Sequence, residues 1–215
     1  MEVHGTYLRR KRKKEKKIVS YLSIVGGVGM KTYVLVYDGF VQFEVILACY
    51  FMKTRGEILT VSLDDCNVTS YEGFDIIPSI NLTDFNPDNA SVLIIPGGNP
   101  KPLINNSQLK ESIVEMNNRG AILAAICSGP IALARAGVLN GKRFTTTLPP
   151  DQYTAFSKSI YTGKDVEIDG NVITAKANAY VDFAIETGKM LGAFRDEKDI
   201  KETIEYFKHF KDVFS

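Results

Sequence analysis

The chain has 215 residues, 45% of them hydrophobic and 24% charged, with a formal net charge of +1. This composition is ordinary for a globular protein with one well-cored domain. Three cysteines, an odd number spaced far apart, exclude a disulfide framework and a CxxC zinc site. No apolar run reaches the roughly 18 residues of a membrane span. We therefore expect a cytoplasmic protein that is not attached to a membrane.

The charge is unevenly distributed along the chain. Residues 1–30 carry eight Lys or Arg and two Glu, a net charge of +6, which leaves −5 for the remainder. Three interpretations of residues 1–29 stay open: sequence translated from a start codon upstream of Met30, a disordered basic tail, or a working signal segment. We favour the first, because "GGVGM" can be encoded by a ribosome-binding sequence followed by a start codon. The folded domain is expected at residues 30–215, without nucleic-acid binding of its own.

The first half of this domain alternates between strand and helix patterns. Apolar, β-branched runs predict buried strands at residues 32–37 and 58–63, and the segment between them predicts a helix at 41–54. The polar stretch that follows predicts a short hairpin formed by "VTSYEG" and "DIIPSI", which Pro78 confines to the edge of a sheet.

The second half continues this alternation to the end of the chain. It predicts, in order, a strand at 90–98, a helix from an N-cap at Ser107 to a C-cap at Gly120, a strand at 121–126, a helix at 128–139, a strand at 143–147, a hairpin at 166–174, and helices at 179–194 and 197–214. Such alternation predicts an α/β fold, a mostly parallel sheet between two layers of helices.

Three unusual loops follow predicted strands, at residues 38–40, 96–99 and 127–129. In open α/β sheets, ligands bind at the carboxyl ends of the strands. We therefore expect these three loops to surround one site, to which the third loop brings Cys127.

Cys127 fits the pattern of a nucleophile elbow, a tight turn from a strand into a helix. Such a turn needs a small residue two positions before the nucleophile and a glycine two positions after it, and Ala125 and Gly129 meet both requirements. Pro130 suits the first turn of the helix, whose unpaired amides favour a thiolate. The alternative, a small buried thiol that only packs, stays open.

Glu44 is the one charged residue of a segment, from Phe40 to Met52, that is apolar nearly all round, as buried helices are. It is either exposed on a narrow polar stripe or buried and functional. A buried carboxyl has a raised pKa and stays protonated. A protonated Glu44 can donate a hydrogen bond to a Cys127 thiolate, whereas an ionised one opposes it. We expect a neutral Glu44 to be the partner of Cys127.

The glycines of the second loop suggest a donor for a developing negative charge. Gly97 and Gly98 would let a backbone amide approach the reacting centre and complete an oxyanion hole with the amide of Ser128. By itself a Pro-Gly-Gly segment is only a turn.

The histidines and the other cysteines supply negative evidence. The chain has two histidines, His4 and His209, so a Cys-His-carboxylate triad would have to recruit His209. Cys49, in the middle of an apolar helix, is expected in the core, and Cys66, beside two aspartates, on the surface. No cofactor or metal is expected.

The segments "VLVYDGFVQFE", "LIIPGGN" and "AAICSGP", in this order and spacing, resemble the ThiJ/PfpI family of the class I glutamine amidotransferase-like superfamily. The resemblance covers residues 31 to about 193. It implies a flavodoxin-like three-layer sandwich, usually a homodimer, with Cys127 as the reactive cysteine and Glu44 as its partner. It also implies oxyanion-type amides at Gly98 and Ser128.

One position departs from the family pattern. Many members carry a histidine shortly after the strand that follows the elbow helix, where this chain has Thr147 and Leu148. The departure leaves the cysteine–glutamate pair intact but puts the peptidase, amidotransferase and histidine-assisted glyoxalase functions in doubt.

Two functions of different classes follow from the resemblance. In the first, a glyoxalase- or deglycase-like enzyme or a related hydrolase, Cys127 adds to the carbonyl of a small substrate such as methylglyoxal while Glu44 moves the proton. In the second, a non-catalytic oxidative-stress sensor or chaperone works through oxidation of Cys127 to a sulfinate. The missing histidine favours the second function.

Overall fold

The computed structural model of the protein describes residues 29–64 and 66–213. The chain divides into two units, Met1–Met30 and Lys31–Ser215, and the fold is that of the second. The expectations for residues 1–29 fall on a segment of which only Gly29 is described, so they remain predictions.

The domain is built on a seven-stranded sheet with the strand order β10-β11-β7-β6-β1-β2-β5. Its strands are β1 (Met30–Val36), β2 (Gly56–Ser62), β5 (Ile80–Asn81), β6 (Val92–Ile95), β7 (Ile122–Ile126), β10 (Val166–Asp169) and β11 (Val172–Ala175). The pairs β1–β6, β6–β7, β7–β11 and β2–β5 are parallel, whereas β10 and β11 are antiparallel. The predicted mostly parallel sheet and its final hairpin are confirmed.

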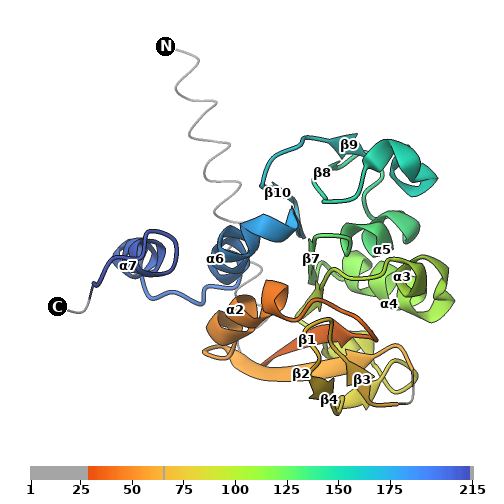
Figure 1. Ribbon diagram of the computed structural model, residues 1–215, viewed down its shortest axis with the longest axis horizontal. Coiled ribbons are helices and arrows are strands. Elements are labelled where there is room, and N and C mark those ends of the chain that lie inside the picture. Colours follow the sequence, from red (N-terminus) through yellow and green to blue (C-terminus); the bar gives the residue numbers. More distant parts are fainter. Residues whose placement is uncertain (1–28, 65, 214–215) are drawn as a thin grey trace. The chain divides into compact units, whose positions relative to one another are not determined.

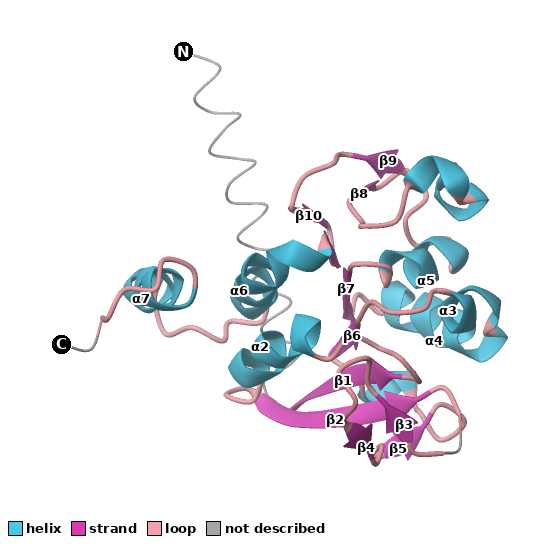
Figure 2. Ribbon diagram, in the orientation of Figure 1, coloured by secondary structure: helices cyan, strands magenta, loops and turns pink. Residues whose placement is uncertain are grey.

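Helices cover both faces of this sheet. They are α2 (Phe43–Met52), α3 (Lys101–Asn105), α4 (Ser107–Asn118), α5 (Pro130–Arg135) and α6 (Tyr180–Met190), and α7 (Glu197–Phe207) follows beyond α6. Short 3-10 turns lie at Pro87–Asn89, Pro150–Gln152, Thr154–Phe156 and Ala177–Ala179. Figures 1 and 2 show α2 and α6 on one face of the sheet and α3, α4 and α5 on the other. This arrangement confirms the predicted flavodoxin-like three-layer sandwich.

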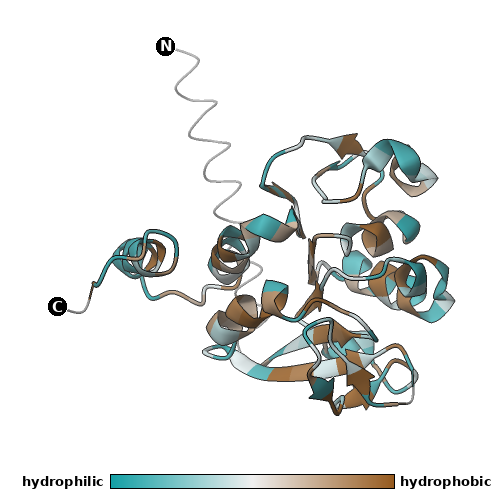
Figure 3. Ribbon diagram, in the orientation of Figure 1, coloured by the Kyte–Doolittle hydropathy of each residue, from teal (hydrophilic) through white to brown (hydrophobic). Residues whose placement is uncertain are grey.

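The central strands are apolar throughout because helices cover both of their faces. All four residues of β6 and all five of β7 are buried, and Figure 3 colours these strands as hydrophobic. A strand buried on both sides needs a continuous apolar run rather than an alternating one. Since full burial of one Leu or Ile contributes about 1.5–3 kcal/mol, these two strands are a large part of the core.

The predicted boundaries are wrong at several helices. The helix expected at 128–139 is only α5, because the left-handed Gly137, with φ +75°, stops it. The helix expected at 197–214 ends at Phe207, and α3 was not predicted at all. Asn106 rather than Ser107 caps α4, since the Asn106 side chain accepts the hydrogen bond of the Leu109 amide at 2.8 Å.

The predicted strand at 143–147 shrinks to β8 (Arg143–Phe144), which pairs in parallel with β9 (Ile160–Tyr161) in a separate small sheet. The residues that follow β8 bond to the elbow instead. The Thr146 hydroxyl and the Thr147 amide both donate to the carbonyl oxygen of Cys127, at 2.7 and 3.0 Å.

The predicted hairpin forms, but as a sheet of its own. Its strands β3 (Val68–Thr69) and β4 (Asp75–Ile76) pair antiparallel, and Pro78 lies between β4 and β5. Only β5 joins the main sheet, beside β2, where it forms one edge.

The helix α2 is buried on one face only, although its sequence is apolar nearly all round. One face of the helix, which includes Glu44 and Ala48, is buried, but Phe43, Ile46 and Tyr50 are 50%, 50% and 66% exposed. These three residues are spaced by three and four positions, so they form one row along the helix. An apolar face can be covered by the chain's own core or by a second molecule, and the sequence does not distinguish the two.

Candidate active site

The elbow at Cys127 is confirmed by its backbone conformation. Cys127 follows β7 directly and has φ +60°, a left-handed value shared, among described non-glycine residues, only with Phe210. Such a conformation costs about 1–3 kcal/mol and persists only where the surroundings impose it. Here the Cys127 amide donates to the Ala175 carbonyl at 2.9 Å, and the Cys127 carbonyl accepts the two threonine bonds of the segment after β8. Both sides of the strained residue are therefore held by hydrogen bonds.

The glycine after Cys127 is required by close backbone packing. A Cβ at Gly129 would lie 2.4 Å from the carbonyl oxygen of Ile95 and 2.9 Å from that of Pro96. The elbow therefore crosses the end of β6 at a distance that admits only glycine. Pro130 begins α5, as predicted.

Glu44 and Cys127 lie against the same glycine. A Cβ at Gly97 would lie 2.6 Å from the Cys127 sulfur and 2.6 Å from Glu44 Oε2. The Glu44 side chain is only 2% exposed, and its Oε2 accepts a hydrogen bond from the Gly97 amide at 2.8 Å. The structure thus brings together the two side chains that the sequence predicts to be partners.

Cys127 and Glu44 compete for one proton. Burial raises the pKa of Glu44, and the Gly97 amide opposes this shift. Burial and an ionised Glu44 raise the pKa of the Cys127 thiol to about 12, against hydrogen bonds from Thr147 and Ser128 that lower it. The two groups titrate as a pair that holds one proton in the middle pH range, on the carboxyl or on the sulfur. The low thiol pKa expected at an elbow is possible only with the proton on Glu44.

The expected oxyanion residues lie beside this pair. Ser128 is 3% exposed, its hydroxyl donates to the Gly98 carbonyl at 2.9 Å, and its amide faces the Cys127 sulfur. Within the described chain, the Gly98 amide donates to no protein group. A Cβ at Gly98 would lie 2.5 Å from the Gly39 carbonyl, so this glycine is also required by close packing.

Tyr37 is a site residue that the sequence analysis missed. Its side chain is 1% exposed, and its hydroxyl donates to the Gly97 carbonyl at 2.8 Å. Burial raises the pKa of Tyr37 well above its ordinary value, so the phenol is a neutral donor. The Val41 amide donates to the same carbonyl at 3.0 Å. Together the two donors fix the orientation of the Gly97–Gly98 peptide, whose amide edge then points away from them.

Thr147, which stands where the family pattern has a histidine, lies beside Cys127. Its hydroxyl accepts the Ala177 amide at 2.9 Å and is a hydrogen-bond donor to the sulfur, which lowers the pKa of the thiol. His209, by contrast, is exposed and follows α7 near the C-terminus. A threonine can orient and stabilise a thiolate, but it cannot act as a general base near neutral pH.

The other two cysteines lie away from the elbow. Cys49 is partly exposed at its position in α2, and burial of the thiol raises its pKa to about 12, whereas Cys66 is exposed. No group of three or more His, Cys, Asp or Glu side chains in the described residues is arranged to hold a metal ion.

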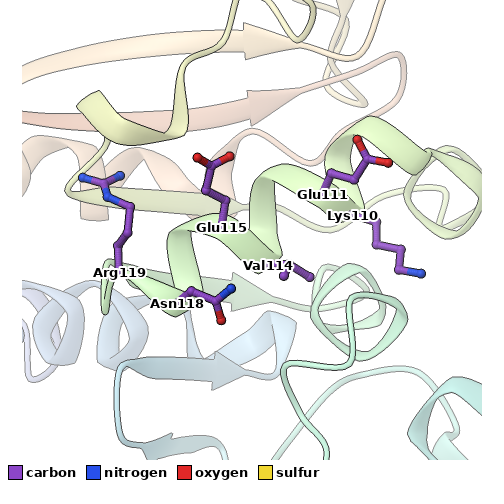
Figure 4. Close-up of a pocket in the computed structure, with 6 residues that line it drawn as sticks. All are labelled: Lys110, Glu111, Val114, Glu115, Asn118 and Arg119. Carbon is purple, nitrogen blue, oxygen red and sulfur yellow. The ribbon is translucent and has the colours of Figure 1, made fainter.

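The two hollows found on the described surface do not include the elbow. One, of about 360 Å³, runs along α4 and is shown in Figure 4, where its lining residues all come from that helix and its C-cap. The other, of about 540 Å³, is formed between the end of α6 and α7. A convex helix face offers no enclosure, so the convergence of loops at Cys127 is the better candidate.

Comparison with known proteins settles the family. The model of the DJ-1/PfpI family matches residues 30–190. The chain belongs to the DJ-1/PfpI family. The resemblance to the ThiJ/PfpI sequences is therefore confirmed over the segment that contains the elbow and Glu44.

Relatives of this family member include named enzymes and solved structures. An uncharacterized protein of Methanocaldococcus jannaschii is 40% identical over 103 residues, which are 46% of this chain and only half of that protein. A deglycase of Pyrococcus abyssi is 29% identical over 150 residues, 68% of this chain and 90% of the deglycase. The crystal structure of a DJ-1 superfamily protein of Agrobacterium tumefaciens is 26% identical, with a TM-score of 0.73 over 84% of this chain and 99% of that one.

We predict that Tyr37→Phe destabilises the domain by about 1 kcal/mol, because a buried hydrogen bond to the Gly97 carbonyl is lost while the Val41 bond remains. Urea denaturation measures this difference. The matched control is Tyr33→Phe, since the Tyr33 side chain is also buried but its hydroxyl bonds to no described group. Equal effects of the two substitutions would show that the Tyr37 hydroxyl contributes nothing specific.

Proposed function

We propose that the protein is a cysteine-dependent enzyme that acts on small reactive carbonyl compounds, in the manner of a glyoxalase or deglycase. The observation that carries the proposal is the contact of Cys127 and Glu44 through one glycine, at an elbow with a left-handed cysteine. Relatives named as deglycases support the substrate class.

In the proposed first step, the Cys127 thiolate adds to the aldehyde carbon of methylglyoxal. A C–S bond forms, the carbonyl π bond breaks, and its oxygen takes the proton of the Glu44 carboxyl to give a hemithioacetal. In this proposal the amides of Ser128, which faces the sulfur, and of Gly98, which donates to no described protein group, take the developing oxygen charge.

The ionised Glu44 then moves a proton between the two carbons of the adduct. It removes the hydrogen of the sulfur-bearing carbon to give an enediolate and returns that proton to the adjacent carbon. The hydroxyl proton of the sulfur-bearing carbon passes, through the same carboxylate, to the oxygen of the adjacent carbon, which leaves a lactoyl thioester and an ionised Glu44. Water hydrolyses the thioester to lactate and restores the Cys127–Glu44 pair with its single proton. Every step uses Glu44 alone as acid and base, which suits a site without histidine.

We expect purified protein to form lactate from methylglyoxal, and Cys127→Ala to abolish the product by removing the nucleophile. Lactate is measured enzymatically or by NMR. Cys66→Ala is the matched control, because it removes an exposed thiol outside the site and leaves turnover unchanged. Lactate formation that survives Cys127→Ala, or its absence from wild type, would contradict the proposal.

We expect Cys127 to titrate well below the roughly 8.5 of a free thiol, because the proposal places the shared proton on Glu44. Iodoacetamide at pH 6 should modify Cys127 before Cys49 and Cys66. Glu44→Leu removes the donor and should raise the alkylation pKa, while Glu44→Gln keeps a donor and part of the shift. Mass spectrometry across a pH series measures these changes. Two outcomes refute the nucleophile: a Cys127 that titrates near 8.5 or above, or one whose titration ignores every change at Glu44.

The second candidate function is oxidative-stress sensing through Cys127, with no turnover. It is favoured by the presence of Thr147, rather than a histidine, beside the sulfur. Two molecules of hydrogen peroxide would then each transfer one oxygen atom to the thiolate and be reduced to water, giving a sulfinate that Glu44 and the Ser128 amide hold. Selective sulfinate formation in a protein that makes no lactate distinguishes this function from the enzyme.

We also propose a cytoplasmic homodimer that associates through the exposed row of α2. That row contains Phe43, Ile46 and Tyr50 and carries no charge, so two copies of it are compatible with each other. In the described part of the chain, no helix combines the length and the hydropathy that crossing a membrane requires.

We predict that the protein sediments at micromolar concentration with twice the chain mass of 23.9 kDa. Ile46→Asp should give monomers, because it places a charge in the apolar row. Ile77→Asp is the control, since Ile77 is 81% exposed and lies outside α2. A wild-type monomer would reject the dimer.

A further inference from the structure

The N-terminus of α2 is capped by a residue from a different part of the fold. Gln42 holds the N-cap position, but its side chain makes no capping hydrogen bond. The cap is Glu72, whose Oε1 accepts the Phe43 amide at 2.9 Å and whose Oε2 accepts the Gln42 amide at 3.1 Å. Glu44 lies in the first turn of this same helix, one residue after the capped amide of Phe43.

Glu72 is held there by the hairpin that carries it, between β3 and β4. The hairpin is bonded through its backbone to the loop before α2: the Gly39 amide donates to the Thr69 carbonyl, and the Tyr71 amide to the Phe40 carbonyl, each at 2.8 Å. These bonds set the position of the Glu72 backbone independently of its side chain. The carboxylate is therefore presented to the helix rather than free in solvent.

The carboxylate of Glu72 is charged at neutral pH. Although burial opposes the shift, the hydrogen bonds from the amides of Phe43 and Gln42 lower the pKa of Glu72. It places one full negative charge at the end of α2 where the helix dipole is positive.

This charge opposes the effect of the helix terminus on Glu44. An uncapped N-terminus stabilises a carboxylate in the first turn, so α2 by itself would favour ionised Glu44 and hence protonated Cys127. Glu72 satisfies the terminal amides and adds a like charge, which raises the pKa of Glu44 together with burial. Cys127 is hydrogen-bonded to Glu44 directly, and Glu72 is among the groups that shift the pKa of Glu44 but not among those that shift the pKa of Cys127.

The remaining titratable groups that face Glu44 are the Cys127 thiol and the neutral Tyr37 phenol. On α6, which packs against α2, the carboxylates of Asp182 and Glu186 are paired with lysines.

We propose that Glu72 is a positioning residue that keeps the shared proton of the Cys127–Glu44 pair on Glu44, and so keeps Cys127 as a thiolate. The inference rests on the proposed function, since it concerns the same pair. In this inference the β3–β4 hairpin helps to set the reactivity of the Cys127 sulfur through Glu72 and Glu44.

The test is the alkylation rate of Cys127 by iodoacetamide between pH 6 and 7 in Glu72→Gln. The amide oxygen of Gln still accepts one helix N–H, so the substitution removes the charge together with one of the two capping hydrogen bonds. We expect the rate to fall about two- to five-fold, the size of a charge effect at a helix terminus. Glu111→Gln, which removes the same charge from the exposed face of α4, should leave the rate unchanged.

A second pair of variants separates the electrostatic role from a structural one. In a Glu44→Gln background there is no shared proton to move, so Glu72→Gln should no longer slow alkylation, whereas a merely structural effect would persist. An unchanged or faster rate in Glu72→Gln alone overturns the inference. If Glu44→Leu still slows alkylation in that case, only the role of Glu72 fails; if it does not, the proposed pair fails with it.

Discussion

The left-handed backbone of Cys127 is the constraint on which the site depends. It turns the chain from β7 into α5 within three residues and leaves the sulfur beside Gly97 rather than inside the sheet. The conformation is unfavourable for a residue with a side chain, so neighbouring segments must hold it. Ala175 binds its amide, Thr146 and Thr147 bind its carbonyl, and Gly129 leaves room for the crossing over β6.

The electrostatics follow from that placement. A thiol and a carboxyl buried together cannot both be ionised, so the pair keeps one proton and its chemistry depends on where that proton resides. Neutral donors surround the pair: the phenol of Tyr37 acts through the Gly97 carbonyl, and the hydroxyl of Thr147 and the amide of Ser128 face the sulfur. The charged group that acts on the pair, Glu72, lies at the N-terminus of α2. In this account the position of the shared proton depends on the charge of Glu72 and on the neutral donors around the pair.

The sequence predicted those parts of the site that depend on local pattern. A small residue and a glycine on either side of Cys127 mark an elbow, and a lone charge in an apolar helix marks Glu44, because both signals lie within a few residues. Tyr37 and Glu72 carry no such signal. Tyr37 reads as one more aromatic residue of a buried strand, and Glu72 as a polar turn residue, until the fold brings them to Gly97 and to α2.

The errors in the fold have the same origin. The alternation of strands and helices gave the three layers, since it depends on the periodicity of apolar residues. Where α5 stops depends on the single left-handed Gly137, and where the strand after it stops depends on bonds from Thr146 and Thr147 to the elbow. The exposed row of α2 cannot be recognised from the sequence, because an apolar helix face has the same sequence whether the core or a second molecule covers it.

The groups around the sulfur come from segments that are far apart in the chain. Tyr37, Glu44, Gly97 and Thr147 meet Cys127 only after parallel strands separated by long crossovers have paired, a slow and late kind of assembly. In the unfolded chain Cys127 is an ordinary exposed thiol with none of these neighbours. Its reactivity therefore appears only when the sheet closes, and a partly folded molecule carries an unremarkable cysteine. The same thiol is a reporter of native topology, since its chemistry distinguishes the completed domain from every less complete arrangement of the chain.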